Sequence, residues 1–401
     1  MTANKIKYIT IMSIMSINIL YGSTYSLSDI ATKIETNSYL EQSLSYKKAS
    51  LESMTMSETA SVPINLNLFT NRAKPNGENS GMEYQVGLSK NIKIGNTNRL
   101  DRDISNLANE ATLIESSKQL ISMSNGVKNL YHQSCLDTKS YQTFELEYTD
   151  FAKIYNKKRK AYRYGEISKL ELMQLDMEYA EMNRRLDEKR AREQTSKDLI
   201  IGMASLEPKA QFQCSDVYPI KSKIDFGGEV FSLTRMANEK RIGSNLNVIE
   251  RYSKSIDTVD ISSFYISELT QEKYGLGVSI PLSFTSAKNE YKKASAMYQN
   301  SELESAQKHI IKEKVRELEK KLYDIKIDYQ KVEKLNENIR YYRTKLLPLI
   351  KKSYDYGESS AIEYLNAKQK LYVLQDELYT TQKRYYESLF GLYDIVETKG
   401  K

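Results

Sequence analysis

Apolar residues recur at every second position in the part of the chain between residues 60 and 95. They form two runs, which are separated by a loop at 70–81 rich in Asn, Gly, Lys and Pro. Alternation of this kind around a turn-rich loop predicts a β-hairpin at 60–95. The alternating apolar positions are Val62, Ile64, Leu66 and Leu68 in the first run, and Tyr84, Val86, Leu88, Ile92 and Ile94 in the second.

A second β-hairpin is predicted at 258–285. A weaker strand begins at Val259, and a stronger run follows in which apolar residues alternate with Gly, Ser and Pro. One apolar face opposite one small or polar face, over about ten residues, is what a transmembrane barrel strand requires, although strands of ordinary sandwiches also alternate. The apolar face of the stronger run consists of Tyr274, Leu276, Val278, Ile280, Leu282 and Phe284.

Four strands are too few to close a barrel. The two open edges would leave backbone hydrogen-bonding groups unpaired in lipid. Two alternatives therefore remain: either the strands lie outside a membrane, or several chains share one barrel.

Each predicted β-hairpin is followed by a long helical hairpin, at 99–205 and at 287–397. In the second, apolar residues recur in steps of three and four, the near-heptad seam of a coiled coil. A helix of about seventy residues would span roughly 100 Å. Pro348 lies near the end of its first helix and is expected to bend or loosen it. The seam residues of the first helix are Leu318, Leu322, Ile325, Tyr329, Val332, Leu335, Ile339, Tyr342 and Leu346. The apolar stripe of the second helix consists of Leu371, Leu374, Leu378, Tyr385, Leu389, Leu392 and Val396.

The turn of each helical hairpin carries the same motif, Tyr-x-Tyr-Gly-Glu-x-Ser. Its glycines, Gly165 and Gly357, favour the left-handed backbone that ends a helix. Ser168 and Ser360 are expected to cap the next helices, and a glutamate follows each serine at the capping-box spacing, at Glu171 and Glu363.

The strand motif around Tyr84 occurs again around Tyr274. The interval between these two copies is almost the same as the interval between the two turn motifs, which indicates a duplicated unit of about half the chain. Polar helices at 27–56 and 229–256 precede the two β-hairpins. The predicted organisation is a signal peptide at 1–26, a first structural repeat at 27–206, an irregular linker at 207–228 and a second structural repeat at 229–398.

The N-terminus has the pattern of an export signal. Lys5 and Lys7 precede a short apolar run from Ile9 to Leu20, and small residues follow it. A buried N-terminal helix is the alternative. Export would place Cys135 and Cys214 in an oxidising compartment, where they can either pair as a disulfide or remain two free thiols.

Composition points away from catalysis and nucleic-acid binding. The 59 basic and 52 acidic residues are mixed along the helices, as on solvated helix faces, and are not gathered in one basic patch. The 31 Tyr residues suit either membrane interfaces or coiled-coil packing. His132 and His309, the only histidines, fit exposed helix positions without metal-ligand spacing. We expect no catalytic residues, no bound metal and no cofactor.

The ordered set of these elements resembles the TolC-type outer-membrane efflux family over nearly the whole chain. The runs at 274–282 and 357–367 are similar to the family's most recognisable stretches. The resemblance implies a mainly α fold with a small β part, in which long α-helical hairpins form a coiled-coil tunnel in the periplasm. Four strands from each of three chains would form a transmembrane β-barrel. It further implies a homotrimer in the Gram-negative outer membrane that works with a periplasmic adaptor protein and an inner-membrane pump.

The resemblance also implies roles for the turn residues. Glu171 and Glu363 would form an acidic gate at the periplasmic entrance, where the family commonly has Asp; their alternative role is capping alone. The residues at the tip would contact the adaptor: Tyr162, Gly165, Glu166, Tyr354, Gly357 and Glu358.

The resemblance therefore implies an exit duct for efflux or secretion, with heavy-metal cations as a candidate substrate class. The alternative is a soluble periplasmic coiled-coil scaffold with a small β-domain. The apolar strand faces discriminate between the two, because a scaffold would bury them and a barrel would expose them to lipid.

Overall fold

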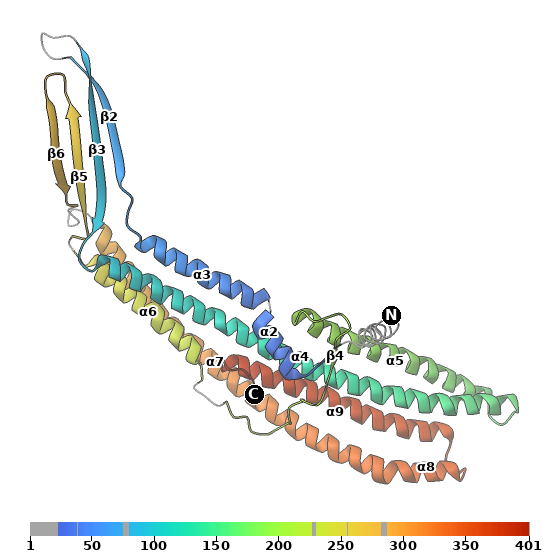
Figure 1. The fold of residues 1–401 in the computed structure, drawn as a ribbon. Coiled ribbons are helices and arrows are strands. Elements are labelled where there is room, and N and C mark those ends of the chain that lie inside the picture. The colour runs from blue at the N-terminus through green and yellow to red at the C-terminus, as the bar shows by residue number, and fades with distance from the viewer. Residues whose placement is uncertain are drawn as a thin grey trace, which may run out of the picture. The chain divides into compact units, whose positions relative to one another are not determined.

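The computed structural model describes residues 23–37, 39–74, 80–226, 230–254, 256–281 and 287–400, and these are mostly helical with a few strands (Figure 1). The chain divides into two compact units, and each unit takes residues from both halves of the sequence. Unit 1 consists of Met1–Gln42, Gln119–Phe231 and Lys314–Lys401, and unit 2 consists of Ser43–Lys118 and Ser232–Glu313. Of the predicted signal peptide at 1–26, residues 1–22 lie outside the described part of the chain.

Two long helical hairpins dominate unit 1, and their bounds are close to those predicted. Helix α4 covers Thr97–Arg163 and α5 covers Lys169–Met203. Helix α7 covers Lys288–Tyr341 and continues through a short π-helical turn into α8, Leu347–Asp355, before α9, Ala361–Ile395. None of the described helices is long and apolar enough to cross a membrane.

The π-helical turn Tyr342–Leu346 ends two residues before Pro348, where the sequence predicted a looser helix. Its wide geometry is visible in the N–H of Leu347, which donates to the carbonyl of Tyr342. A proline lacks an N–H and crowds the carbonyl four residues earlier. The wider turn accommodates Pro348, so the helical path continues to Asp355.

The predicted seam forms the core of the second hairpin, and a cluster that the sequence did not predict forms the core of the first. In the second hairpin, Val332, Leu335 and Ile339 of α7 pack with Leu371 and Leu378 of α9. In the first, α4 and α5 pack through a buried cluster to which α9 adds one residue. Full burial of each such side chain contributes about 1.5–3 kcal/mol, so thin seams suffice along long helices. The first-hairpin cluster consists of Phe144, Phe151, Leu175, Met182, Leu186 and Leu365.

Unit 2 contains one antiparallel sheet in the order β2-β3-β5-β6 (Figure 1). Its strands are β2, Asn65–Ala73; β3, Gly81–Lys93; β5, Thr258–Ser267; and β6, Glu272–Ser279. The β3–β5 pairing joins the hairpins of the two repeats. The predicted extent of the loop at 70–81 is wrong, because backbone pairing with β3 extends β2 to Ala73 despite its polar residues. Leu282 and Phe284 lie outside the described residues.

Two helices accompany the first part of α4 in unit 2. Helix α3 covers Tyr39–Thr59 and α6 covers Ser232–Tyr252. The side-chain amide of Asn109 donates to the carbonyl of Leu51 at 3.0 Å, and the Ser244 hydroxyl donates to that of Ile104 at 2.9 Å. The single helix predicted at 27–56 corresponds to α2, Leu27–Asn37, in unit 1 and to α3 in unit 2.

The segment at 207–226, here called the strap, is irregular as predicted but is fixed to unit 1. A disulfide joins Cys214 of the strap to Cys135 of α4. The strap also contributes β4, Gln211–Phe212, which pairs in parallel with β1, Thr24–Tyr25, an element that the sequence did not predict. Hydroxyls of α9 complete the attachment: the Lys221 N–H donates to the Tyr385 hydroxyl at 2.8 Å.

His132 lies beneath the strap, and its predicted exposure is wrong. The side chain is fully buried, and the Tyr218 N–H donates to its Nε2 at 2.9 Å. Its Nδ1 lies 2.6 Å from the Lys128 carbonyl, so Nδ1 carries the proton of the neutral ring. The ring packs against Tyr218 and Tyr386, which are distant in sequence. The local pattern of α4 therefore could not predict its burial. His309 is exposed.

Burial lowers the pKa of His132 to about 4, which makes the strap sensitive to acid. In the unfolded chain the pKa is about 6.5, so the unfolded state binds more protons between these values. We expect the free energy of unfolding to fall by about 3 kcal/mol as the pH drops from 6.5 to 4. Thermal unfolding of the full chain across this range measures the fall.

His132→Gln removes the titrating group, and should flatten the part of the pH dependence due to this ring. His309→Gln is the matched control because His309 is exposed, and it should unfold like the parent protein at every pH. Equal pH dependence in the parent protein and in His132→Gln would contradict the assignment.

Candidate functional site

The two helical-hairpin turns have the same backbone structure. Gly165 and Gly357 have φ of +77° and +76°, the left-handed conformation that non-glycine residues rarely adopt. In the first turn, the Gly165 N–H donates to the Tyr162 carbonyl and the Glu166 N–H donates to the Ala161 carbonyl, each at 3.0 Å. These two bonds define a Schellman motif.

The second turn repeats the motif at the equivalent positions. Gly357 N–H donates to the Tyr354 carbonyl at 3.0 Å, and Glu358 N–H donates to the Ser353 carbonyl at 2.9 Å. Both turns lie at the same end of unit 1 (Figure 1). The duplicated sequence motif therefore builds two equivalent backbone turns at the same end of one unit.

The serines cap the following helices, but the two candidate gate glutamates bind differently. The Glu171 N–H donates to Ser168 Oγ and the Glu363 N–H donates to Ser360 Oγ, both at 3.1 Å. Glu363 completes a capping box, because its carboxylate accepts the Ser360 N–H at 2.7 Å.

Glu171 does not complete a capping box. Its carboxylate lies 3.3 Å from the Lys158 ammonium of α4, and the two side chains are about one-quarter exposed. The position equivalent to Lys158 in the second repeat is Ile350, which offers no charge. The partner on the preceding helix therefore decides where each glutamate points, and that partner lies outside the duplicated motif.

The predicted tip residues are mostly, but not uniformly, exposed. Tyr162, Gly165, Glu166, Gly357 and Glu358 are exposed. Tyr354 is half-buried because its ring stacks on Tyr364, with centroids 5.1 Å apart and planes 7° apart.

The most exposed aromatic rings of the turns are Tyr164 and Tyr356, which are 81% and 71% exposed. Both directly precede the left-handed glycine, where the chain leaves the helix. The sequence predicted contacts for the first tyrosine of each motif, whereas the second tyrosine is the more exposed.

Polar contacts join the first helical hairpin to α9. The Asp150 carboxylate accepts from the Lys368 ammonium at 2.7 Å, and the Glu178 carboxylate accepts from the Gln369 amide at 3.0 Å. The hydroxyls of Thr143 and Tyr379 lie 3.1 Å apart. Ion pairs that are partly exposed contribute little individually, about 0–1 kcal/mol. The two hairpins are thus held together by several weak polar links beside the apolar core.

The sheet of unit 2 provides a second candidate surface. Residues paired directly across an antiparallel sheet share a face, and the pairs Leu66–Leu88, Leu68–Val86 and Ile261–Val278 place apolar residues together. This face is exposed: Leu276 is 85% and Leu68 is 63% accessible. The opposite face carries mainly Asn, Gln, Ser, Asp and Gly side chains. Exposed apolar area of this extent indicates an interaction surface.

Within the described ranges, no group of three or more His, Cys, Asp and Glu side chains could hold a metal ion. His132 is occupied by the hydrogen bonds described above, and both cysteines form the disulfide.

The different binding of the two glutamates predicts different amide exchange at the two caps. Glu363→Ala removes the acceptor of the Ser360 N–H, so hydrogen exchange at this amide should accelerate about five-fold, for a loss of about 1 kcal/mol. Glu171→Ala is the matched control, since its carboxylate binds Lys158, and it should leave exchange at the Ser168 amide unchanged. Equal acceleration at both amides would show that the caps are equivalent.

The fold matches several solved outer-membrane channels. VceC from Vibrio cholerae has a TM-score of 0.72 at 13% identity, covering 94% of this chain and 97% of that chain. The CmeC outer membrane channel of Campylobacter jejuni has a TM-score of 0.73 at 13% identity, covering 92% and 85%. CusC, described as forming a transmembrane channel, has a TM-score of 0.74 at 14% identity, covering 95% and 94%.

No protein-family model matches this sequence, and no curated protein matches it either. The similarity thus lies in the structure, over nearly the whole length of each chain, and it confirms at the level of the fold the resemblance derived from the sequence. The chain has the fold of TolC-type outer-membrane efflux channels.

Proposed function

We propose that this protein is the outer-membrane exit duct of a tripartite efflux or secretion system. The observation that carries the proposal is the four-stranded sheet, with its exposed apolar face and two open edges, in a chain with a channel fold. A soluble scaffold would bury that face, so the exposed face favours the channel. Substrate would pass from periplasm to exterior without chemical change.

The open edges support a homotrimer. Within the sheet that the structure describes, β2 and β6 each pair with one neighbour, so one edge of each has unpaired N–H and C=O groups. Unpaired backbone groups cost several kcal/mol each in lipid, whereas a closed barrel satisfies them all. If β6 of one chain pairs with β2 of the next, three chains form a closed twelve-strand barrel.

The helical hairpins would form the periplasmic tunnel, and their turns would contact a periplasmic adaptor. Tyr164 and Tyr356 fit such a contact, because exposed aromatic rings commonly anchor interfaces. An inner-membrane pump would supply the energy for transport. The predicted export signal at 1–26 and the Cys135–Cys214 disulfide fit a periplasmic location.

Glu171 and Glu363 would surround the tunnel entrance as an acidic gate. A ring of carboxylates in a narrow, water-filled pore attracts cations and repels anions. In this structure the Glu171 carboxylate binds Lys158, and the Glu363 carboxylate accepts the Ser360 N–H. Each carboxylate would have to leave this partner in order to face the pore. Heavy-metal cations are the first substrate class to test, because an acidic entrance suits cations and the strand at 274–282 resembles members that serve metal pumps.

Membrane extraction tests the assignment to the outer membrane. We expect the chain to stay with the outer membrane through alkaline and high-salt washes and to require detergent for release. Leu276→Lys places a charge on the apolar face and costs up to about 2–4 kcal/mol in a bilayer, so insertion should fall sharply. Gln85→Lys on the opposite face is the control and should insert normally. Release of the parent protein without detergent would exclude the channel.

Conductance in planar bilayers tests the gate. Combined Glu171→Gln and Glu363→Gln substitutions remove the charges, while glutamine at 363 can still cap the helix. We expect a several-fold loss of cation preference or a higher conductance. Glu166→Gln with Glu358→Gln is the matched control at exposed turn positions. If both double variants conduct like the parent protein, the acidic gate is wrong.

A further inference from the structure

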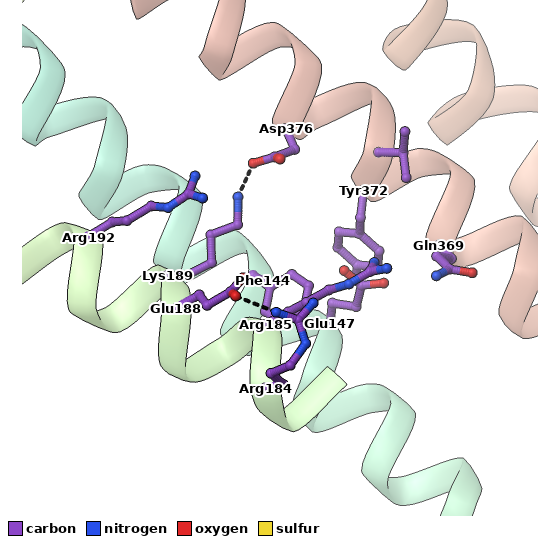
Figure 2. Close-up of a pocket in the computed structure, with 11 residues that line it drawn as sticks. Phe144, Glu147, Arg184, Arg185, Glu188, Lys189, Arg192, Gln369, Tyr372 and Asp376 are labelled. Atoms are coloured by element: carbon purple, nitrogen blue, oxygen red, sulfur yellow. Dashed lines mark hydrogen bonds and ion pairs between the residues drawn. The ribbon is translucent and has the colours of Figure 1, made fainter. Parts of the chain in front are cut away.

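The cavity around Glu147 lies in unit 1 among α4, α5 and α9, and its basic side chains are bound by neighbouring carboxylates (Figure 2). Arg184 and Arg185 of α5 both bind the carboxylate of Glu181. Lys189 of α5 binds a carboxylate of α9, as a dashed line in Figure 2 shows. These charged groups therefore serve the packing of the helices.

A cavity of about 260 Å³ in unit 2, here called the junction cavity, lies where the sheet meets the helices. It is lined by the link between α3 and β2, residues 59–62, by the end of β3, residues 90–93, and by Asn98 in the first turn of α4. Figure 1 shows β3 running into α4 at this end of the sheet. The volume is below the roughly 300–1,000 Å³ of sites for drug-sized ligands, and it suits a small polar group.

Pro63 interrupts the pairing of two strands beside the junction cavity. The pairing of β2 with β3 begins at Asn65 and Ser89, and the same register would place Pro63 opposite Asn91. A proline has no N–H to donate, so the ladder of hydrogen bonds stops before it. The link between α3 and β2 therefore separates from β3, and the cavity lies between them.

The separation leaves backbone groups of β3 without a neighbouring strand. The N–H of Ile94 donates to the Asp257 carbonyl at 3.0 Å, so Ile94 is bonded toward the chain of β5. Backbone groups alternate in direction along an antiparallel strand, so those of Asn91 and Lys93 are directed to the opposite side. Among the described strands none pairs with them there, because β2 has ended. The cavity thus has both N–H donors and C=O acceptors along one wall.

Two side chains of the lining also lack partners. The Oδ1 atom of Asn98 is buried and forms no hydrogen bond among the described residues. Within the same described ranges, the ammonium of half-buried Lys90 forms no hydrogen bond or ion pair, whereas the ammonium of Lys93 binds Asp101 at 2.6 Å. A buried polar atom without a partner is costly, so Asn98 marks a position where a ligand can supply one.

The junction cavity adjoins the exposed apolar face of the sheet. Side chains alternate along a strand, so Lys90 lies on the same face as Leu88 and Ile92, which are both exposed. Val62 of the cavity lining is exposed as well. Long basic side chains at the border of an apolar surface extend toward polar headgroups. A molecule bound here can place a polar end in the cavity and an apolar chain along the sheet.

The polar groups of the junction cavity favour an occupant with both an anionic acceptor and a cationic donor. Lys90 and the unpaired N–H groups suit a phosphate. The Asn98 Oδ1 atom and the unpaired carbonyls suit an ammonium. A phosphoethanolamine headgroup combines the two in one small unit, whereas a phosphocholine headgroup has a phosphate but no N–H.

We propose that the junction cavity binds the headgroup of a phosphoethanolamine lipid, with its phosphate at Lys90, its ammonium at Asn98 and its acyl chains along the apolar face beside Leu88. The inference rests on the proposed function, which places this face in a membrane. The headgroup supplies hydrogen bonds that Pro63 cannot give to the edge of β3. It also fixes the depth of the sheet at the border between lipid and water.

Native mass spectrometry of the full-length protein in detergent tests the site. The protein is titrated with phosphatidylethanolamine and with phosphatidylcholine of the same acyl chains. Phosphatidylethanolamine should bind about ten-fold more tightly, because it alone donates N–H groups to Asn98 and to the unpaired carbonyls. Free O-phosphoethanolamine, which has no acyl chains to cover the apolar face, should bind more weakly than the lipid by a factor of about ten or more.

Three variants separate the contacts. Lys90→Gln should weaken the binding of both lipids about ten-fold, because both carry the phosphate. Asn98→Ala should weaken phosphatidylethanolamine and leave phosphatidylcholine unchanged, so the preference between the two lipids should fall. Lys48→Gln changes an exposed lysine of α3 outside the cavity, and this matched control should bind both lipids like the parent protein.

Equal binding of the two lipids by the parent protein would overturn the proposal. Lys90→Gln that binds like Lys48→Gln, or an unchanged preference in Asn98→Ala, would do the same. Free O-phosphoethanolamine binding as tightly as the lipid would leave the apolar face without a role and would also overturn it. The proposed function is measured separately, by the requirement for detergent in membrane extraction. A chain that needs detergent for release and shows none of these lipid differences keeps the proposed function and loses this inference.

Discussion

The unpaired backbone groups of β2 and β6 are the constraint on which the proposed assembly depends. Among the described strands, each of these has a hydrogen-bonded neighbour on one side only, and the sheet also exposes an apolar face. A single chain therefore leaves the backbone groups of these edges without hydrogen bonds and leaves the apolar face of the sheet uncovered. In the proposed trimer, the neighbouring chains satisfy the edges and lipid covers the face, so assembly and membrane insertion solve one physical problem together.

The duplicated halves share their backbone and differ in their side-chain partners. Both turns use glycine in the left-handed conformation and the same two hydrogen bonds, because these depend only on the backbone. The glutamates differ because Lys158 in one copy corresponds to Ile350 in the other. Two gate candidates that look identical in sequence thus begin from different interactions, and the duplication does not make the two hairpins functionally equivalent.

Local periodicity predicted most of the secondary structure, including α4 and α9 to within a few residues. It failed where distant residues decide the outcome. The strap is irregular in sequence, yet a disulfide and several hydroxyl contacts fix it, and His132 beneath it is buried. The cavity around Glu147 was equally invisible, because α4, α5 and α9 each contribute only part of its lining.

The sequence by itself determined the order of the elements, their duplication, the helical seams and the glycine turns, because each rests on periodicity or on the conformational preferences of single residues. Only the tertiary structure decided which groups meet: β3 with β5, Lys158 with Glu171, and Glu147 with the arginines of α5. It also assembled each compact unit from both repeats. Such contacts depend on packing between segments far apart in the chain, which no local pattern encodes.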